Sequence, residues 1–373
     1  MIYFDNAGTT KVDNECMAIL ERYCLENYFN PSALYRQSVE VKKDLKRAKQ
    51  EIVSALRGDG EIIFTSGGTE SANMAVFGVT KRKGSRIIIS KSEHAAVKNS
   101  ALKLREIGFE VVECDVDIYG RVDEKKFISL VNENTSFVSI MHVNNETGGI
   151  NDIKRLNAIA KSVNKDIIFH SDGVQAIGKI PVNLRDLGVD LYSMSAHKIH
   201  SPKGVGAIYL KEGVRINPIM HGGGQELGIR PSTENIPAIM CFSLMLKKMV
   251  KDLSKNLEKV SKIKDFIQKN IDESIIKILT DENCSPYIIS LALKDVRGEV
   301  MLHSLEKYGI MIGTGSACSS SKKNTDHWQL PYLSQSYKNG KIRISFSHEN
   351  TVEQADYFIN KLNLEYSTLK RYT

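Results

Sequence analysis

Between about residues 60 and 210, short β-rich runs alternate with helical segments, and this alternation constrains the fold more than any other feature of the chain. The runs lie at 61–65, 86–90, 111–114, 137–141 and 167–170. They are largely apolar over consecutive positions, as is typical of strands buried on both faces. The pattern predicts an α/β fold with a mostly parallel sheet covered by helices. Because ligands bind at the carboxyl ends of the strands in such sheets, we expect the functional residues directly after each strand.

The last third of the chain has a different pattern, in which shorter strand-like runs mix with helices. The strand-like runs lie at 287–291, 310–312 and 341–345, and the helical stretches lie near 299–308 and 351–364. This mixture predicts a smaller α+β domain. We expect a large domain of residues 14–255 and a small domain that combines residues 1–13 with 256–373.

The chain of 373 residues carries 51 basic and 44 acidic side chains, and the formal net charge of +7 raises the question of nucleic-acid binding. Residues 247–270 hold eight lysines against three acidic residues, so this stretch supplies +5 of that charge. Its apolar residues recur every three or four positions, which predicts one long amphipathic helix with a lysine-rich solvent face. A series of aromatic residues that could stack on bases is missing between these lysines. We therefore expect no direct nucleic-acid partner.

Composition and cysteine spacing restrict the compartment and the metal chemistry. Apolar residues make up 42% of the chain, and no run approaches the roughly 20 apolar residues that a membrane-spanning helix needs. The amino terminus reaches a charge at Asp5, which argues against a secretory segment. The six cysteines contain no C-x-x-C pair, so neither a disulfide framework nor a zinc ribbon is expected. These features predict a cytoplasmic enzyme with no membrane partner and no metal.

The strongest local signal is the segment Ser193-Met194-Ser195-Ala196-His197-Lys198, which precedes a glycine-containing turn at 202–206. A lysine among small and hydroxylated residues at a strand end is typical of a Schiff-base lysine for pyridoxal phosphate (PLP). Asp172 follows the preceding strand, and a buried aspartate beside the pyridine nitrogen keeps that nitrogen protonated. Alone, Lys198 reads as a solvated turn residue and Asp172 as a helix cap. Together, on successive strand ends, they favour a PLP site.

Two further strand ends carry weaker signals. Ser66-Gly67-Gly68-Thr69-Glu70-Ser71 forms a turn into a helix, where exposed backbone N–H groups suit a phosphate. His94 follows the run at 86–90, and its imidazole could stack on a pyridine ring and transfer protons near neutral pH. Each feature alone is as well explained by a structural role.

Cys318 lies in the segment Gly313-Thr314-Gly315-Ser316-Ala317-Cys318-Ser319-Ser320-Ser321. A cysteine among glycine, serine and alanine is unlike an inert cysteine, which is usually buried among apolar neighbours. The other five cysteines fit that inert pattern and are expected to be dispensable for chemistry. A thiolate outside the core is the group required to carry a sulfur atom away from a site. The alternative is a cysteine that the loop merely tolerates.

The ordered motifs resemble those of the cysteine desulfurases of the NifS/IscS-like type, within the class-V aminotransferase group of PLP enzymes. The resemblance extends from Tyr3 through Arg343, which is essentially the whole chain. It rests on the segments 3–10, 65–71, 93–94, 141–148, 170–175, 195–198, 221–226 and 315–318. It implies a PLP-dependent aminotransferase-like fold (fold type I) and a homodimer.

The resemblance also implies roles for the residues that match the motifs. Lys198 would hold PLP, Asp172 would pair with its pyridine nitrogen, Gln175 would face its phenolic oxygen, and His94 would stack on its ring and transfer protons. The phosphate would be bound by Gly68, Thr69, Ser195 and His197, with Thr233 from the other subunit. Asn145 and Arg343 would hold the substrate carboxylate. Cys318 would attack the sulfur of L-cysteine and become a persulfide, leaving L-alanine.

Two segments depart from the family pattern. Residues 29–35 lack the usual glycine and histidine of the entrance motif and end in Tyr35, and Pro231-Ser232 replaces the usual Ser-Gly. Both concern the pocket and the dimer contact and leave the groups of the covalent chemistry in place. The sequence does not name the sulfur-acceptor protein, which could be an iron–sulfur cluster scaffold or a tRNA or cofactor thiolation protein.

Alternative functions predict different behaviour. A class-V aminotransferase or β-lyase would use Lys198 and Asp172 but not Cys318, and a selenocysteine lyase would differ in its preferred substrate. A weakly catalytic scaffold that docks sulfur-transfer partners would show little turnover with added acceptor and reductant. The presence of Lys198, Asp172, His94 and Cys318 together favours the desulfurase.

Overall fold

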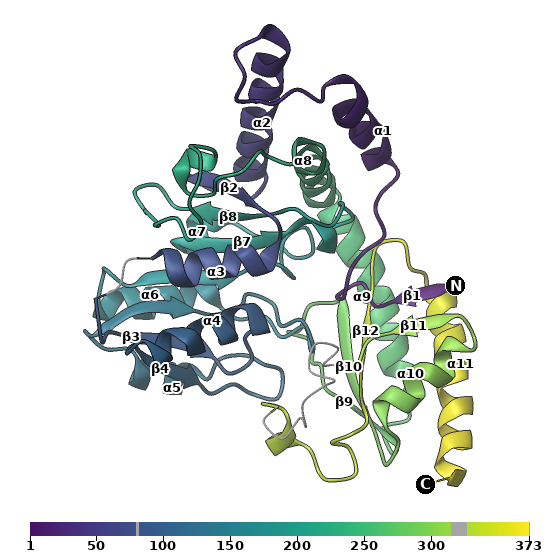
Figure 1. The fold of residues 1–373 in the computed structure, drawn as a ribbon. Coiled ribbons are helices and arrows are strands. Elements are labelled where there is room, and N and C mark those ends of the chain that lie inside the picture. Colours follow the sequence, from purple (N-terminus) through teal and green to yellow (C-terminus); the bar gives the residue numbers. More distant parts are fainter. Residues whose placement is uncertain (80–81, 315–326, 373) are drawn as a thin grey trace.

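A seven-stranded sheet forms the centre of the larger part of the computed structural model, which describes residues 1–79, 82–314 and 327–372 (Figure 1). The strand order is β2-β8-β7-β6-β5-β3-β4, and β8 alone runs antiparallel to its neighbours. The strands are β2 (Glu61–Thr65), β3 (Arg86–Ser90), β4 (Glu110–Cys114), β5 (Thr135–Ser139), β6 (Ile168–Asp172), β7 (Leu191–Ser195) and β8 (Gly206–Leu210). The prediction of a mostly parallel sheet is confirmed.

Adjacent residues of the strands pack into different hydrophobic clusters, which explains why the strands are apolar at consecutive positions. Ile62 and Ile88 belong to one cluster, whereas Ile63, Ile87 and Ile89 belong to another. The first cluster includes residues of helices α2 (Arg36–Ala55), α6 (Ile153–Val163) and α8 (Ile236–Lys251), and the second includes residues of α3 (Gly68–Gly78) and α4 (Ala95–Glu106). Successive side chains of a strand point to opposite faces, so both faces of the sheet are buried.

Shorter elements complete this part of the molecule. They are α1 (Glu15–Glu21), the π-helix η1 (Arg22–Glu26), α5 (Glu124–Leu130), α7 (Leu184–Leu187) and the 3-10 turns η2 (Ala196–Lys198) and η3 (Glu226–Gly228). Helices α1 and α2 project from the top of the molecule in the view of Figure 1. None of the described helices is both long enough and apolar enough to cross a membrane.

The last third of the chain forms a three-stranded sheet, and one further strand of it pairs with the amino terminus in a separate two-stranded sheet. Strands β12 (Lys341–Ser345), β10 (Ile288–Leu293) and β9 (Ile276–Ile278) pair antiparallel, and β1 (Ile2–Phe4) pairs parallel with β11 (Ile310–Ile312). Helices α9 (Leu253–Asn270), α10 (Gly298–Glu306) and α11 (Val352–Leu369) pack on them, and the turns η4 (Leu330–Tyr332) and η5 (Lys370–Tyr372) complete it. A capping box between Thr351 and Gln354 fixes the start of α11.

The buried clusters support the proposed division of the chain. Phe4 and Ala7 belong to the same cluster as residues from Val260 to Tyr366, and the Phe4 ring meets Phe346 edge-on, with 5.3 Å between ring centroids. Residues 2–7 therefore pack with the carboxyl-terminal third, although they precede the large sheet in sequence, whereas Val12 packs against the core of the large sheet. The boundaries at 13/14 and 255/256 stay a prediction.

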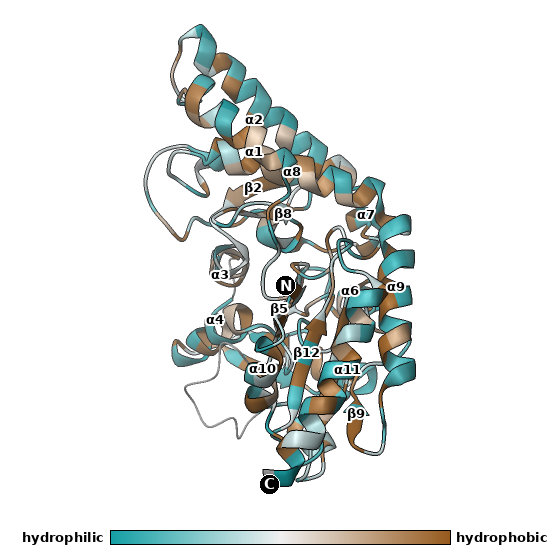
Figure 2. Ribbon diagram, turned by 90° about the vertical axis from the view of Figure 1, so that its right-hand side faces the viewer, coloured by the Kyte–Doolittle hydropathy of each residue, from teal (hydrophilic) through white to brown (hydrophobic). Residues whose placement is uncertain are grey.

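The prediction of one helix over 247–270 with solvated lysines is wrong in two respects. The helix is interrupted at Asp252, because Met249 of α8 packs into the core of the large sheet and Val260 of α9 packs into the other core. Lys264 is buried, and its Nζ donates to the carbonyls of Asp281 and Cys284 at 3.1 Å each. Hydrophilic and hydrophobic residues nevertheless alternate along α9 and α11, as Figure 2 shows.

Gly173 is a position at which a side chain would directly disturb the large sheet. A Cβ at this residue would lie 1.9 Å from Cε1 of Tyr192, whose ring is fully buried. We expect Gly173→Ala to lower the free energy of unfolding by about 1–3 kcal/mol, because a packed ring must move. Urea denaturation measures this loss. Gly224→Ala is the control, since nothing lies within 4 Å of a Cβ there, and an equal effect in both variants would contradict the assignment.

Candidate functional site

The predicted site residues lie at the carboxyl ends of neighbouring strands. Asp172 ends β6, Ser195 ends β7, and Lys198 follows at the end of η2. His94 follows β3, two strands beyond β6, and begins α4 as its N-cap. These four residues therefore lie at the strand ends or shortly after them, as expected, and their functional roles stay a prediction.

Lys198 and Gln175 converge on one backbone carbonyl. Nζ of Lys198 donates to the oxygens of Ala7 and Gly8 at 2.6 Å each, and Nε2 of Gln175 donates to the Ala7 oxygen at 2.9 Å. Gln175 is buried. Two side chains from the large sheet therefore meet at a carbonyl of the amino-terminal segment. Ala7 and Gly8 lie in the motif segment 3–10, but these contacts of their carbonyl oxygens were not predicted from the sequence.

Asp172 is a buried carboxylate for which no ion pair occurs among the described residues. It is 7% exposed, and one of its oxygens, Oδ1, accepts a hydrogen bond from the Val174 N–H at 2.9 Å. Burial raises the pKa of Asp172, while the charge of His94, the Val174 hydrogen bond and the charge of Lys198 act in the opposite direction. These influences place His94 and Lys198 around the carboxylate. A cation bound next to Asp172 would favour its charged form.

His94 is oriented by the backbone of its own helix. Its Nδ1 accepts a hydrogen bond from the Ala96 N–H at 3.1 Å, so a neutral ring carries its proton on Nε2. The preceding residue, Glu93, is buried, and its Oε1 accepts hydrogen bonds from the Ser90 hydroxyl at 2.7 Å and the Met141 N–H at 2.6 Å. Its Oε2 has no partner in the described part of the chain. Burial raises the pKa of Glu93 to about 8.

The predicted phosphate-binding residues lie where α3 meets the ends of β6 and β7. A Cβ on Gly68 would lie 2.9 Å from Cγ2 of Val174 and 3.5 Å from Cβ of Ser195, so these elements pack closely. Thr69 is exposed on the first turn of α3. Nδ1 of His197 lies 3.0 Å from the hydroxyl of Thr9, and burial together with the Lys198 charge lowers the pKa of His197 to about 4. His197 is therefore neutral at physiological pH.

Arg343 and Asn145 are brought together across the two parts of the molecule. Nη1 of Arg343 donates to the Asn145 carbonyl at 2.9 Å, and Nη2 donates to Oδ1 of Asp5 at 2.6 Å. The Nε atom of Arg343 is buried and has no partner among the described residues. Asp5, which sequence reasoning missed, therefore already places a carboxylate against this guanidinium.

Lys179 is a second lysine at the site, which the sequence did not reveal, and it is more deeply buried than Lys198. It is 4% exposed, and its Nζ donates to Oε1 of Gln175 at 2.8 Å. Burial, with the charges of Lys198 and Arg343, lowers the pKa of Lys179 to about 7. Its spacing of four residues from Gln175 was the one signal that could have found it.

Three other predictions have different outcomes. Cys318 lies outside the described residues. Thr233 is exposed in the loop before α8, and its role concerns the other subunit of a dimer, so it stays a prediction. The expectation that Cys24 packs inertly is wrong, because Cys24 is exposed on η1, whereas Cys16, Cys114, Cys241 and Cys284 are buried.

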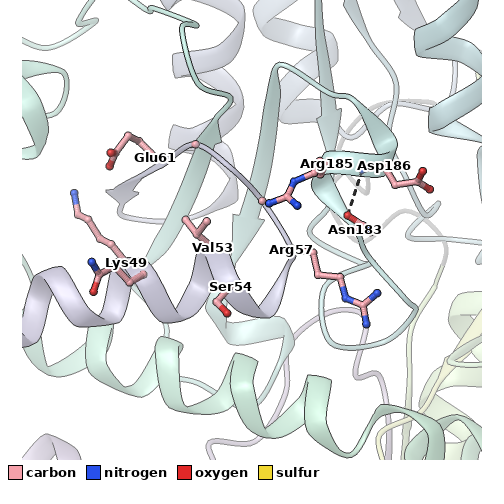
Figure 3. A pocket seen from close by; sticks show the side chains of 11 residues that line it. Lys49, Val53, Ser54, Arg57, Glu61, Asn183, Arg185 and Asp186 are labelled. Carbon is pink, nitrogen blue, oxygen red and sulfur yellow. Dashed lines mark hydrogen bonds between the residues drawn. The ribbon is translucent and has the colours of Figure 1, made fainter.

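A cavity of about 800 Å³ lies elsewhere on the large sheet (Figure 3). It is lined by residues of α2 and α7, such as Lys49, Val53 and Arg185, and none of the predicted site residues lines it. A second cavity, of about 1100 Å³, lies between α9 and the smaller sheet and is lined by Lys264 and Cys284 among others. Neither cavity is part of the site described above.

Comparison with known proteins decides the family. The family model for aminotransferase class V matches residues 2–358 of this chain. The chain belongs to this family. It is 37% identical over 369 residues to a protein named cysteine desulfurase IscS of Dictyoglomus turgidum, covering 97% of this chain and 93% of that protein. The Methanosarcina thermophila protein of the same name is 36% identical over 366 residues and matches 95% of this chain and 89% of that protein.

Solved structures of class-V aminotransferases agree with this assignment. A NifS-like protein superposes with a TM-score of 0.91 at 34% identity and covers 99% of this chain and 100% of that one. A NifS-like protein from Rickettsia africae gives a TM-score of 0.87 at 27% identity, covering 98% of this chain and 99% of that one. Within the class-V aminotransferases, the chain therefore belongs to the IscS/NifS group of cysteine desulfurases, and the predicted fold class is confirmed.

The buried carboxyl of Glu93 makes the stability of the protein depend on pH. Because the pKa of Glu93 is raised to about 8 in the folded protein, the neutral form stabilises the fold fully below pH 4.5, and this contribution is lost as pH rises through 8. We expect Glu93→Gln to gain stability relative to the parent protein between pH 5 and pH 9, on the order of 2–5 kcal/mol. Urea denaturation across this range measures the difference. A difference independent of pH would contradict a buried neutral carboxyl.

Proposed function

We propose that the chain is a PLP-dependent cysteine desulfurase that removes sulfur from L-cysteine, gives L-alanine and carries the sulfur as a persulfide on Cys318. The observation that carries the proposal is the convergence of Lys198 and Gln175 on the Ala7 carbonyl, beside the buried carboxylate of Asp172. An amine, an amide donor and a carboxylate that forms no ion pair among the described residues suit a pyridine aldehyde. The IscS names of the relatives support the same reaction.

The residues present fit PLP. To bind it, Lys198 and Gln175 would exchange their hydrogen bonds to the Ala7 carbonyl for contacts with the cofactor. Lys198 would bond to the aldehyde carbon, Gln175 would donate to the phenolic oxygen, and Asp172 would pair with the pyridine nitrogen. When bound, the cofactor supplies an electron-accepting ring for the chemistry at the substrate Cα. The buried carboxylate of Asp172 supports this assignment, because a charged ring nitrogen would favour its ionised form.

The phosphate of the cofactor would be bound at the start of α3. There the backbone N–H groups of Gly68 and Thr69 come before the first full turn of the helix, and Ser195 lies beside them. His197 is neutral, so its contribution would be an N–H donor rather than a positive charge. Thr233 would reach this region from the other subunit of a homodimer.

The substrate carboxylate would be held by Arg343 and Asn145. The guanidinium already pairs with Asp5, which shows its fit for a carboxylate, and its buried Nε is a further donor. The structure of SspA, which superposes with a TM-score of 0.81 at 26% identity, was solved in complex with cysteine. That complex supports L-cysteine as the substrate class of this chain.

His94 and Cys318 would carry out the transfer of the sulfur. His94 would act at the substrate through Nε2, which carries the proton of the neutral ring, and would donate this proton first and take it back afterwards, because Nδ1 is bound by the helix backbone. The Cys318 thiolate would form a bond to the substrate sulfur while the carbon–sulfur bond of the substrate breaks. A cytoplasmic sulfur-acceptor protein would then remove the outer sulfur from Cys318.

Replacement of the sulfur carrier tests the proposal directly. In Cys318→Ser, we expect release of alanine and sulfide from L-cysteine to fall by about two orders of magnitude or more, while the visible absorbance of bound PLP is retained. Alanine is quantified by chromatography and sulfide by a colorimetric assay. Cys24→Ser is the matched control, since Cys24 is the exposed cysteine among the described residues. Unchanged sulfide output in Cys318→Ser would refute the role of Cys318.

Arg343→Lys tests the carboxylate site. Lysine keeps the positive charge opposite Asp5 but loses the planar fork, so we expect KM for L-cysteine to rise about tenfold with a smaller change in kcat. Steady-state kinetics separates the two parameters. Arg297→Lys, at an exposed arginine that pairs with Glu299, should leave both unchanged. A drop in kcat alone would contradict a role of Arg343 in substrate binding.

A further inference from the structure

Lys179 lies next to the proposed cofactor site, yet no step of the proposed reaction uses it. Its side chain is buried, and its Nζ donates to an amide oxygen, Oε1 of Gln175, at 2.8 Å. No ion pair of Lys179 occurs among the described residues, although a buried ammonium is usually paired with a carboxylate. Lys179 is therefore poorly explained as part of a stabilising salt bridge.

The partners of Gln175 leave only one orientation for its amide. The side chain of Lys179 presents hydrogen-bond donors, and the carbonyl of Ala7 presents an acceptor. Oε1 of Gln175 accepts from Lys179, and Nε2 of Gln175 donates to the Ala7 carbonyl. If the amide rotated by half a turn, its N–H groups would face the donors on Nζ of Lys179, and its oxygen would face the carbonyl oxygen of Ala7. Lys179 and Ala7 together thus direct the N–H groups of Gln175 toward the volume that also contains Nζ of Lys198.

We propose that Lys179 is a positioning residue that fixes the Gln175 amide with its N–H donor directed at the phenolic oxygen of the cofactor. The inference rests on the proposed function, in which Gln175 faces that oxygen. When Nε2 leaves the Ala7 carbonyl for another acceptor, the contact with Lys179 alone keeps the amide from turning over. Without it, Oε1 could face the phenolic oxygen, and two acceptors would repel each other.

The backbone between the two residues makes the contact rigid. The N–H groups of Ala176 and Ile177 both donate to the Gly173 carbonyl, and those of Lys179 and Ile180 both donate to the Ala176 carbonyl. Gln175 and Lys179 are therefore carried by one turn with fixed geometry. Both the charged and the neutral amine of a lysine carry N–H groups, so the contact persists on either side of its pKa.

Lys179→Met tests this role, because methionine fills similar space without a donor. We expect the dissociation constant of PLP from this variant to increase about three- to tenfold, the change that loss of one hydrogen bond produces. We also expect the visible absorbance maximum of the loaded protein to shift, because the phenolic oxygen loses its oriented donor. Thermal unfolding of the unloaded protein verifies that the variant folds, and removal of a buried amine should not lower its midpoint.

Two further proteins isolate the contact. Lys264→Met removes the other buried lysine, whose Nζ donates to two carbonyls of the small domain, and it should leave PLP binding and the absorbance maximum unchanged. In a Gln175→Leu background, Lys179→Met should have no further effect on either measurement, because there is no amide left to orient.

Outcomes for the inference and for the proposed function are distinguishable. An unchanged PLP dissociation constant and absorbance maximum in Lys179→Met would overturn the positioning role, and so would an equal effect in the Gln175→Leu background. The parent protein could release no alanine from L-cysteine while Lys179→Met still changes both the PLP dissociation constant and the absorbance maximum. In that case the positioning role stands and the proposed reaction fails.

Discussion

The carbonyl oxygen of Ala7 is the point on which the arrangement of the site depends. It accepts from Lys198 at 2.6 Å and from Gln175 at 2.9 Å, and the segment that carries it is held by the smaller sheet. The Asn6 N–H donates to the Ser345 carbonyl at 3.2 Å, and the Ala7 N–H donates to the Ser345 hydroxyl at 2.9 Å. The buried donors of the large sheet are thus satisfied by a segment that the small domain fixes, so the geometry of the site requires both parts to be folded.

The charges of the site follow from the same arrangement. Three cationic side chains, Lys198, Lys179 and Arg343, lie close enough to influence one another, since the charges of Lys198 and Arg343 lower the pKa of Lys179. Asp5 neutralises Arg343 directly. Positive charge on these side chains attracts anionic groups, such as a phosphate and a carboxylate. Loading with an anionic cofactor would therefore relieve the repulsion that the unloaded site contains.

Much of the fold and part of the site could be predicted from local sequence patterns. The runs 61–65 and 86–90 correspond to β2 and β3, because consecutive apolar residues directly reflect burial on both faces. Lys198 and Asp172 could be found because each follows a strand. The break at Asp252 and the burial of Lys264 could not be predicted, since the helical period is the same on both sides and only tertiary packing distinguishes two cores.

The contacts of Asp5, Ala7 and Lys179 at the site could not be predicted from the sequence for a different reason. Asp5 meets Arg343 across 338 positions of sequence, and the Ala7 carbonyl meets Lys198 across 191, so neither contact leaves a local pattern. Lys179 is separated by only four residues from Gln175, but its role depends on its burial, which a charged residue in a turn does not reveal. Lys198 and Asp172 left a local pattern because each lies at or just after the end of an apolar strand.

Glu93 and Asp172 are two buried acids near the site, and different neighbouring groups act on their pKa values. Both are buried, and burial raises the pKa of each. Asp172 is also influenced by the charges of His94 and Lys198, which favour its ionised form, whereas the hydrogen bonds to Glu93 come from a neutral hydroxyl and a backbone N–H. The negative charge of Asp172 further disfavours ionisation of Glu93. In the proposed function, a cationic ring nitrogen of the cofactor would act on Asp172 in the same direction as His94 and Lys198.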